Sequence, residues 1–457
     1  GWRVAAGAAR GQWCAATARS VTTWQRNWGE QRWSERPRRM VGDRTMATTQ
    51  AKAKMLMWEQ ANTEERRMTL QDMLKFGENA DRHTVLLSAV FLQKELPVRL
   101  AKRIQELRSL PRPMWSTKAV SSLIELYEES FVRIIDHEPP HTTPLETSFS
   151  AMLADIKDKH ALVQANIGAG FAEMQQAGVT QCSMETKEIQ NLLTKFYCGR
   201  IGIRMLIRQH LSLRHDAEAH EDGERRGMTR VTQDFVGCVQ TRCRIKTVLD
   251  AAIADARKAC KLHLNCAPKV IISGNENLTT AYIPEHLYVV LFEVLKNAMR
   301  ATVDNHRRGR GKAGEAEDLP VVECTLSGGE DCYVKISDRG GGIPPSSLKR
   351  VWNFAFTSAP GGMSELAGYG YGLPLSRLYA RYWGGELSVC SLENFGVDCV
   401  LRLGAPARKE SREGEVEMWV HRCAKARALK PVQRARAPGR SMSSSSLMRS
   451  PALGRDV

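Results

Sequence analysis

The chain has 457 residues, of which 42% are hydrophobic and 25% charged, and this is enough for two domains with cores of their own. The composition excludes a collagen, a wholly disordered polymer and a disulfide-stapled miniprotein. The longest apolar stretch runs from Val85 to Leu92 and is interrupted by Ser88. It is far shorter than the ~20 residues of a bilayer-spanning helix, so we expect no transmembrane segment.

The net charge of +16 is concentrated at the two ends of the chain. Residues 1–39 carry +6 and residues 405–457 carry +7, which leaves +3 for residues 40–404. Because the central part is almost neutral, we expect no nucleic-acid partner.

The terminal segments differ in composition from the rest of the chain. Residues 1–46 are rich in Arg and poor in acids, which is typical of a transit peptide. The alternative is a leader upstream of Met40 or Met46, or the end of a fragment. Residues 405–457 are basic and rich in Ser, and we expect them to be disordered.

The twelve cysteines contain no Cys-x-x-Cys pair, and the closest two are Cys238 and Cys243. In a chain of this length, that pattern favours reduced thiols over a disulfide framework or a zinc site.

Residues 47–225 are predicted to form a helical domain, which we interpret as a four-helix bundle. Apolar residues recur there at three- and four-residue spacing, as in Leu96, Leu100, Ile104 and Leu107. We expect Pro97 to lie early in its helix. The charged residues 211–232 lose the periodicity, which predicts a domain boundary.

Residues 233–404 alternate between helical and strand patterns, which indicates an α+β sandwich. The expected helices are Ile245–Leu262, Glu285–Asn305 and Leu373–Trp383. The expected strands are Lys269–Ser273, Val321–Leu326, Cys332–Ser337, Glu386–Leu392 and Gly396–Leu403.

The first chemical motif lies on the predicted helix after Pro284. Glu293 and Asn297 are four residues apart, so both side chains lie on one helix face. A carboxylate beside an amide oxygen can supply a general base and a ligand for Mg²⁺. The same spacing occurs on many solvated helices, so the pair alone leaves both interpretations open.

The second motif is Asp338-Arg339-Gly340-Gly341-Gly342, which follows a predicted strand. An aspartate at a strand end can accept a hydrogen bond from the amino group of adenine, and glycines let the backbone approach a flat ring. A glycine-rich hairpin loop is the alternative.

The third motif, Gly368-Tyr369-Gly370-Tyr371-Gly372, precedes a predicted helix. Glycines before a helix N-terminus offer backbone N–H donors to a phosphate chain. Each motif is weak alone, but the three in this order are hard to assemble by chance.

The ordered trio resembles the N box and the two glycine boxes of the GHKL ATPase and kinase superfamily, which includes DNA gyrase, MutL and sensor histidine kinases. There is no Gly-Lys-Ser/Thr of a P-loop, and no His-Arg-Asp or Asp-Phe-Gly of a eukaryotic-type protein kinase. The resemblance implies a Bergerat α/β sandwich that binds ATP and Mg²⁺.

Within that superfamily, the chain is similar to the mitochondrial 2-oxoacid dehydrogenase kinases, above all the pyruvate dehydrogenase kinases. The similarity covers roughly residues 69–403. It is carried by residues 91–101, 202–210, 291–302, 356–360 and 370–380.

The resemblance implies a role for each motif residue. Glu293 would be the base for the incoming hydroxyl, Asn297 would bind Mg²⁺, and Asp338 would hold adenine. The other implied nucleotide contacts are Arg300, Gly340, Gly342, Thr357, Ser358, Gly368, Tyr369, Gly370, Tyr371, Gly372 and Leu373. Lys296 and Arg300 either neutralise charge near the γ-phosphate or form a salt-bridged helix flank. We expect His210 and Tyr379 to be core residues, with ligand contact as the alternative.

The chain departs from the usual family pattern at four places. Val289 stands where a His four residues before the acid is usual, and Val397 stands where a Thr is usual. The lid residues 361–367 are few, and no carboxy-terminal Asp-Trp is present.

The implied function is a Ser/Thr kinase of the mitochondrial matrix that phosphorylates, and so inactivates, the E1α subunit of the pyruvate dehydrogenase complex. The resemblance also implies docking on the E2 lipoyl domain and a homodimer. The absence of a His-Glu-x-x-Thr-Pro phosphoacceptor segment argues against a histidine kinase. The alternatives are a branched-chain 2-oxoacid dehydrogenase kinase, a GHKL ATPase without protein kinase activity, and a non-enzymatic adaptor.

Overall fold

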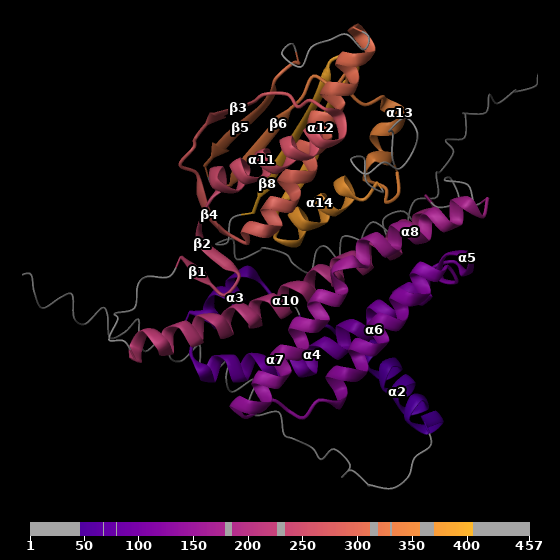
Figure 1. Ribbon diagram of the computed structural model, residues 1–457, viewed down its shortest axis with the longest axis vertical. Helices are drawn as coiled ribbons and strands as arrows, with labels where there is room; N and C mark the ends of the chain where they lie inside the picture. The colour runs from indigo at the N-terminus through magenta and orange to yellow at the C-terminus, as the bar shows by residue number, and fades with distance from the viewer. Residues whose placement is uncertain are drawn as a thin grey trace, which may run out of the picture.

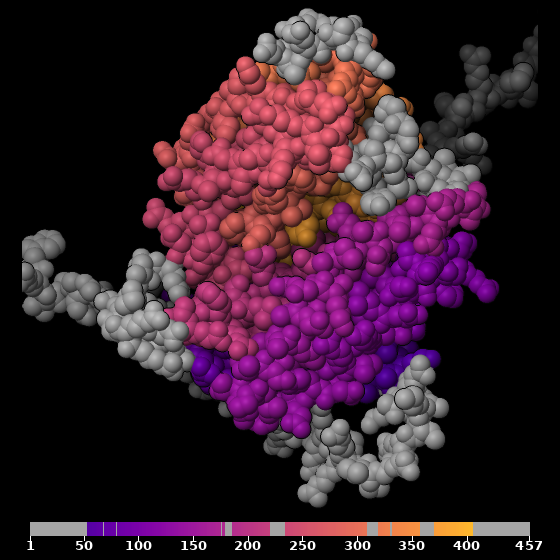
Figure 2. Space-filling model, in the orientation of Figure 1, coloured from indigo at the N-terminus to yellow at the C-terminus, as the bar shows by residue number. Residues whose placement is uncertain are grey.

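The computed structural model describes residues 46–66, 68–78, 80–178, 185–225, 234–310, 319–329, 331–356 and 370–404. Figure 1 shows a helical half, built from the earlier residues, beneath a half in which helices cover a sheet. Figure 2 shows the two halves packed directly on each other. The predicted α+β class is confirmed.

The helical half is a bundle around α4, α6 and α10. The helix α4 packs against both α6 and α10, while α8 packs on α6 and α7 on α10. Side chains cap several of these helices: Thr69 and Asp72 form a capping box on α3, and Asp81 accepts from Thr84 N at the start of α4. The helices of this half are α2 (Met46–Ala61), α3 (Leu70–Gly77), α4 (Arg82–Arg108), α5 (Arg112–Trp115), α6 (Lys118–Asp136), α7 (Thr143–Lys159), η1 (His160–Leu162), α8 (Val163–Gln176) and α10 (Lys187–Arg225).

Pro97 lies in the middle of α4, so the expectation that it lies early in its helix is wrong. The helix starts at Arg82, and buried apolar residues continue on both sides of the proline, at Leu92, Leu96 and Leu100. Burial of this stripe stabilises the helix across the position where proline removes one backbone hydrogen bond.

The helix α10 continues to Arg225, through much of the charged segment in which the sequence predicts a boundary. Arg214 Nε lies 2.9 Å from Glu218 Oε1, one turn further on. Ion pairs of this spacing support a helix that has lost its apolar stripe.

The second half contains a five-stranded sheet of order β3-β5-β6-β8-β7. The strands are β3 (Val270–Gly274), β5 (Val322–Gly328), β6 (Cys332–Ser337), β7 (Glu386–Leu392) and β8 (Gly396–Leu403). Only the β3–β5 pair among these is parallel. The sheet packs against the helices α11 (Ile245–Leu264), α12 (Pro284–Arg310) and α14 (Gly372–Tyr382). Two short helices, α13 (Pro345–Leu348) and η3 (Arg350–Trp352), precede α14.

A second, three-stranded sheet has no counterpart among the predicted elements. It consists of β1 (Phe235–Val236), β2 (Val239–Arg244) and β4 (Thr279–Tyr282) in the order β1-β2-β4. Two of the strands have four residues or fewer, and β2 carries two arginines, so no clear alternation of apolar residues marks them.

Two further observations concern the described part of the chain. No helix there is long and apolar enough to cross a bilayer. The nine cysteines that it contains are all free thiols, as predicted, and five of them are buried.

Candidate active site

The motif residues converge on one pocket between α12, the end of β6 and the start of α14. The described residues that line it and that the sequence singled out are Glu293, Asn297, Arg300, Asp338, Gly340, Gly342, Gly370, Gly372 and Leu373. Thr357, Ser358, Gly368 and Tyr369 lie outside the described residues. Tyr371 does not line the pocket: its side chain is buried against Phe171, Tyr197 and Phe354.

Glu293 lies on the face of α12 that borders the pocket, one turn before Asn297. Its two carboxylate oxygens lie 2.9 and 2.8 Å from Lys296 Nζ. A Cβ atom on Gly372 would come within 2.3 Å of Glu293 Oε2, so the carboxylate reaches the backbone that starts α14. The acid is therefore held beside the glycine loop.

Asn297 offers the pocket an amide oxygen, a ligand type that suits a hard cation such as Mg²⁺. Among the residues described, no group of three or more His, Cys, Asp or Glu side chains is arranged to hold a metal ion. If Mg²⁺ accompanies a bound nucleotide at this site, Asn297 and the phosphate oxygens would be its ligands.

Arg300 brings a positive charge to the same pocket. Its Nε and Nη1 are buried and have no hydrogen-bond partner among the described residues. Burial lowers the pKa of Arg300 and neighbouring Asp304 opposes that shift, but arginine remains charged at neutral pH. Unpaired buried donors on a cation fit a negatively charged ligand such as a phosphate chain.

Asp338 follows β6 and is buried beneath the pocket. Its Oδ1 accepts hydrogen bonds from Gly340 N at 2.8 Å and from Val397 N at 3.3 Å. Burial raises the pKa of Asp338 to about 6, although these two bonds act in the opposite direction. Because the backbone bonds use Oδ1, Oδ2 is available to accept from an adenine amino group.

Three glycines keep the backbone close to the pocket. Gly342 and Gly370 have φ values of +79° and +75°, which favour glycine, and an added Cβ would lie 2.3 Å from Leu392 O and 2.4 Å from Phe356 O respectively. At Gly340 an added Cβ would lie 2.4 Å from the Cβ of Ala301. These close approaches explain why the motif positions carry no side chains.

The three sequence motifs do not include the apolar side of the pocket, formed by Val389, Val397 and Cys399, of which the sequence analysis singled out only Val397. Val389 pairs directly with Cys399 across β7 and β8, and Val397 lies two residues away on the same face. Burial raises the pKa of Cys399 to about 12, so its thiol stays protonated. Alternation along Gly396–Leu403 could have shown which residues share a face, but not that the face borders a site.

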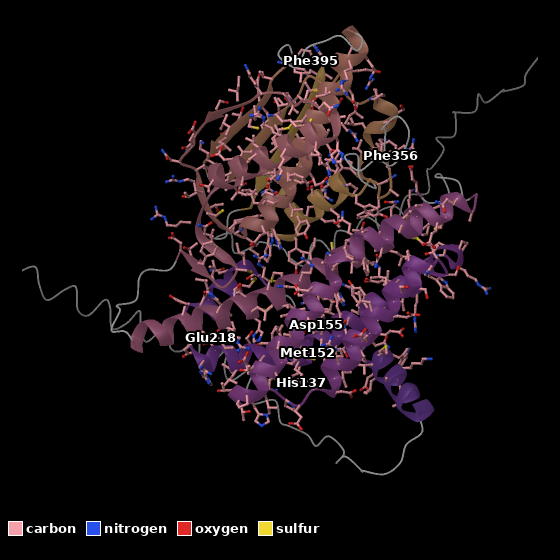
Figure 3. The ribbon with its side chains drawn as sticks, in the orientation of Figure 1. His137, Met152, Asp155, Glu218, Phe356 and Phe395 are labelled. Atoms are coloured by element: carbon pink, nitrogen blue, oxygen red, sulfur yellow. The ribbon has the colours of Figure 1, made fainter. Side chains whose placement is uncertain are left out.

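Two phenylalanine rings near the pocket pack against arginine guanidinium groups. Phe356 lines the pocket, and the centre of its ring lies 4.5 Å from Arg350 Cζ. The centre of the Phe395 ring lies 4.1 Å from Arg339 Cζ. Figure 3 places both phenylalanines in the half that holds the sheet, far from His137 and Met152 in the bundle.

His210 is a core residue, as expected. It is fully buried, and its ring nitrogens lie 2.8 Å from Ser150 Oγ and 3.0 Å from Ser88 Oγ. Burial lowers the pKa of His210 to about 4, so its 3.7 Å approach to Glu146 is not an ion pair at neutral pH. Tyr379 packs its ring against that of His286 and borders a separate cavity between the two halves.

Two family models match the chain, one in each half. Residues 67–240 match the model described as mitochondrial branched-chain alpha-ketoacid dehydrogenase kinase. Residues 282–409 match the model described as histidine kinase-, DNA gyrase B-, and HSP90-like ATPase. The second match contains the whole of the pocket-lining set from Glu293 to Cys399.

Curated relatives cover most of the chain. The mitochondrial [pyruvate dehydrogenase (acetyl-transferring)] kinase of Drosophila melanogaster is 34% identical over 355 residues, which is 74% of this chain and 81% of the relative. The kinase of the same name from Arabidopsis thaliana is 33% identical over 74% of this chain and 89% of its own length. Isozyme 3 from Homo sapiens is 32% identical over 74% of this chain and 82% of its own length. With these relatives and the pocket, the chain belongs to the family of mitochondrial 2-oxoacid dehydrogenase kinases.

Proposed function

We propose that this protein is an ATP-dependent protein kinase that transfers the γ-phosphate of ATP to a serine of the E1α subunit of the pyruvate dehydrogenase complex and thereby inactivates the complex. The observation that carries the proposal is the convergence of Glu293, Asn297, Arg300 and Asp338 on one pocket beside the glycine loop. The names of the relatives support the choice of substrate.

Each residue has a distinct task in the proposed reaction. Asp338 accepts a hydrogen bond from the adenine amino group, and Arg300 with the backbone N–H groups at the start of α14 binds phosphate oxygens. Asn297 supplies an oxygen ligand to Mg²⁺, which when bound neutralises charge on the phosphates.

Glu293 acts on the acceptor. Its carboxylate takes the proton of the serine hydroxyl while the serine oxygen bonds to the γ-phosphorus. The bond between that phosphorus and the β,γ-bridging oxygen breaks, and the electron pair leaves on ADP. A base of this kind contributes about 10²–10⁴ to the rate.

We further propose Mg²⁺ as cofactor, the mitochondrial matrix as location, and docking of the helical half on the E2 lipoyl domain. The mitochondrial names of the relatives support the location. A homodimer through the five-stranded sheet is supported by exposed apolar side chains on two of its strands, Ile271 on β3 and Tyr333 on β6.

Two alternatives differ from this proposal in the group that accepts the phosphate. The helical half matches a model named for branched-chain alpha-ketoacid dehydrogenase kinase, which favours the branched-chain complex as the second candidate. An ATPase would use Glu293 to activate water instead of a serine hydroxyl.

The test incubates the full chain with γ-labelled ATP, Mg²⁺ and the separate E1 components of the two complexes. E293Q is the matched control because it keeps the shape of the side chain and removes the base. We expect label in the E1α of the pyruvate complex, none with E293Q, and ATP affinity within about threefold for the two proteins.

Other outcomes would change the assignment. Label in the branched-chain E1α alone would move the substrate to that complex. Phosphate released to water without labelled protein would indicate an ATPase. Loss of ATP binding in E293Q would show that Glu293 holds the nucleotide and is not the base.

A further inference from the structure

The Glu293 carboxylate has a cationic partner on its own helix. Lys296 Nζ lies 2.8 Å from Oε2 and 2.9 Å from Oε1, so the ammonium contacts both oxygens. The side chains of Lys296 and Glu293 are only 12% and 23% exposed. An ion pair between two solvent-exposed side chains three residues apart on a helix contributes little to stability, whereas the Lys296–Glu293 pair is mostly shielded from water.

The ammonium of Lys296 also lies near an aromatic ring. It lies 5.6 Å from the centre of the Phe292 ring, at a distance where the ring face attracts a cation. Phe292 stacks on Tyr288 with ring planes 11° apart, and the Tyr288 hydroxyl donates to Asp255 Oδ2 on α11 at 2.7 Å. Lys296 thus contacts two residues of its own helix, and one of them, Phe292, stacks on a tyrosine that is hydrogen-bonded to α11.

Two other residues beside the Glu293 carboxylate offer it no polar side-chain atom. Gly372 faces it with no side chain, and a Cβ there would lie 2.3 Å from Oε2. The residue one turn before Glu293 is Val289, which has no polar side-chain atom to offer a hydrogen bond. Among the described residues, Lys296 is the one that hydrogen-bonds to the Glu293 carboxylate.

We propose that Lys296 is a positioning residue for phosphoryl transfer, which holds the Glu293 carboxylate toward the acceptor hydroxyl, and this rests on the proposed function of Glu293. A carboxylate has about four lone-pair directions, and one contact to each oxygen leaves the others for the acceptor. Fixing the base in the productive orientation raises the rate without contributing to nucleotide affinity.

The test compares K296M and K296R in the full chain. K296M keeps the aliphatic stem and removes the charge, and K296R keeps the charge. We expect K296M to lower kcat for E1α phosphorylation 10- to 100-fold, with the Kd for ATP within threefold of the unmodified protein. We expect K296R to restore at least one third of kcat.

Two further variants test whether kcat depends on where the Lys296 ammonium is placed or only on a positive charge being present. F292L removes the ring that holds the ammonium, and we expect kcat to fall 3- to 10-fold. K258M, on the exposed side of α11, removes a lysine outside the pocket and is expected to leave kcat unchanged.

The outcomes separate this proposal from the function on which it rests. Unchanged kcat in K296M, or equal losses in K296M and K296R, would overturn the positioning role. A loss of ATP affinity in K296M that accounts for the whole effect would also overturn it, because Lys296 would then be a nucleotide contact. If E293Q retains transfer, the role of Glu293 itself fails, whatever Lys296 does.

Discussion

The Tyr197 ring of α10 stacks on the Phe354 ring with centroids 5.1 Å apart and planes 22° apart. Tyr371, inside the glycine loop, packs its ring 5.9 Å from Tyr197 and 5.8 Å from Phe354. Gln190 of α10 also donates to Phe354 O and accepts from Phe354 N. The bundle is thus in direct contact with the backbone that precedes the glycine motif and with Tyr371 inside that motif.

This cluster predicts that Y197A destabilises the fold and weakens ATP binding. Removal of a buried aromatic ring costs about 3–5 kcal/mol, and the glycine loop would lose its support. Y197F is the matched control: the Tyr197 hydroxyl is buried without a partner among the described residues, so its removal should be neutral or stabilising. Calorimetric unfolding and ATP titration measure the two effects. Equal losses in Y197A and Y197F would contradict this packing.

G372A and G370A should fail in different ways. At Gly372 the added methyl meets the flexible end of Glu293, so we expect G372A to fold normally and to lose at least tenfold in kcat. At Gly370 the methyl meets the backbone at Phe356 O, and φ is +75°, so we expect a lower unfolding temperature. Thermal unfolding and the labelled-phosphate assay distinguish the two. A stable and active G370A would contradict the loop geometry.

Asp338 predicts a pH dependence of nucleotide affinity. Burial raises its pKa to about 6, so in the free protein the carboxylate is protonated as the pH falls through that value. We expect ATP affinity to fall below pH 6 by more in the unmodified protein than in D338N, which does not titrate there. Titrations from pH 5 to pH 8 in both proteins measure the difference. Parallel curves would exclude Asp338 as the group responsible.

The same shift has a consequence for stability. Because the folded pKa of Asp338 lies above the ordinary value of 3.8, protonation favours the folded state. Its stabilising contribution is fully present below about pH 4 and is lost as the pH rises through 6. We therefore expect D338N to be the more stable protein at pH 7.5 in the absence of nucleotide, measured by urea unfolding. A less stable D338N would show that its backbone hydrogen bonds outweigh the cost of burying the charge.

The buried His160 and His210 and the half-buried His286 predict a loss of stability as the pH falls, which is the opposite pH dependence to that of Asp338. Burial lowers the pKa of His160 and His210 to about 4, and that of His286 to about 3. Between pH 6.5 and these values the unfolded chain binds protons that the folded chain does not, so stability falls as the pH falls. Each group contributes up to about 1.4 kcal/mol per pH unit.

H210Q provides the check. Glutamine can hydrogen-bond with Ser88 and Ser150 but does not titrate, so the variant should lose less stability than the unmodified protein between pH 7 and pH 5. Urea unfolding at both pH values measures the difference. An equal loss in both proteins would mean that His210 titrates normally in the folded state.

Local spacing was enough to predict most elements of the second half. The strands Cys332–Ser337, Glu386–Leu392 and Gly396–Leu403 have the predicted bounds, because apolar alternation and flanking glycines are local signals. Glu293 and Asn297 share a helix face for the same reason. The predicted place of Pro97 early in its helix was wrong because burial of the apolar residues of α4 overrides the local tendency of proline to break a helix.

The contacts that complete the pocket could not be predicted in this way. Asp338 meets Val397 because β6 pairs with β8, about sixty residues further along the chain, and Cys399 faces the pocket for the same reason. Tyr371 belongs to a glycine motif but is drawn into the core by Tyr197 from the other half. The sequence by itself determined which chemical groups are present and in what order. The tertiary structure alone decided which of them touch, because strand register and the packing of the two halves depend on residues far apart in the chain.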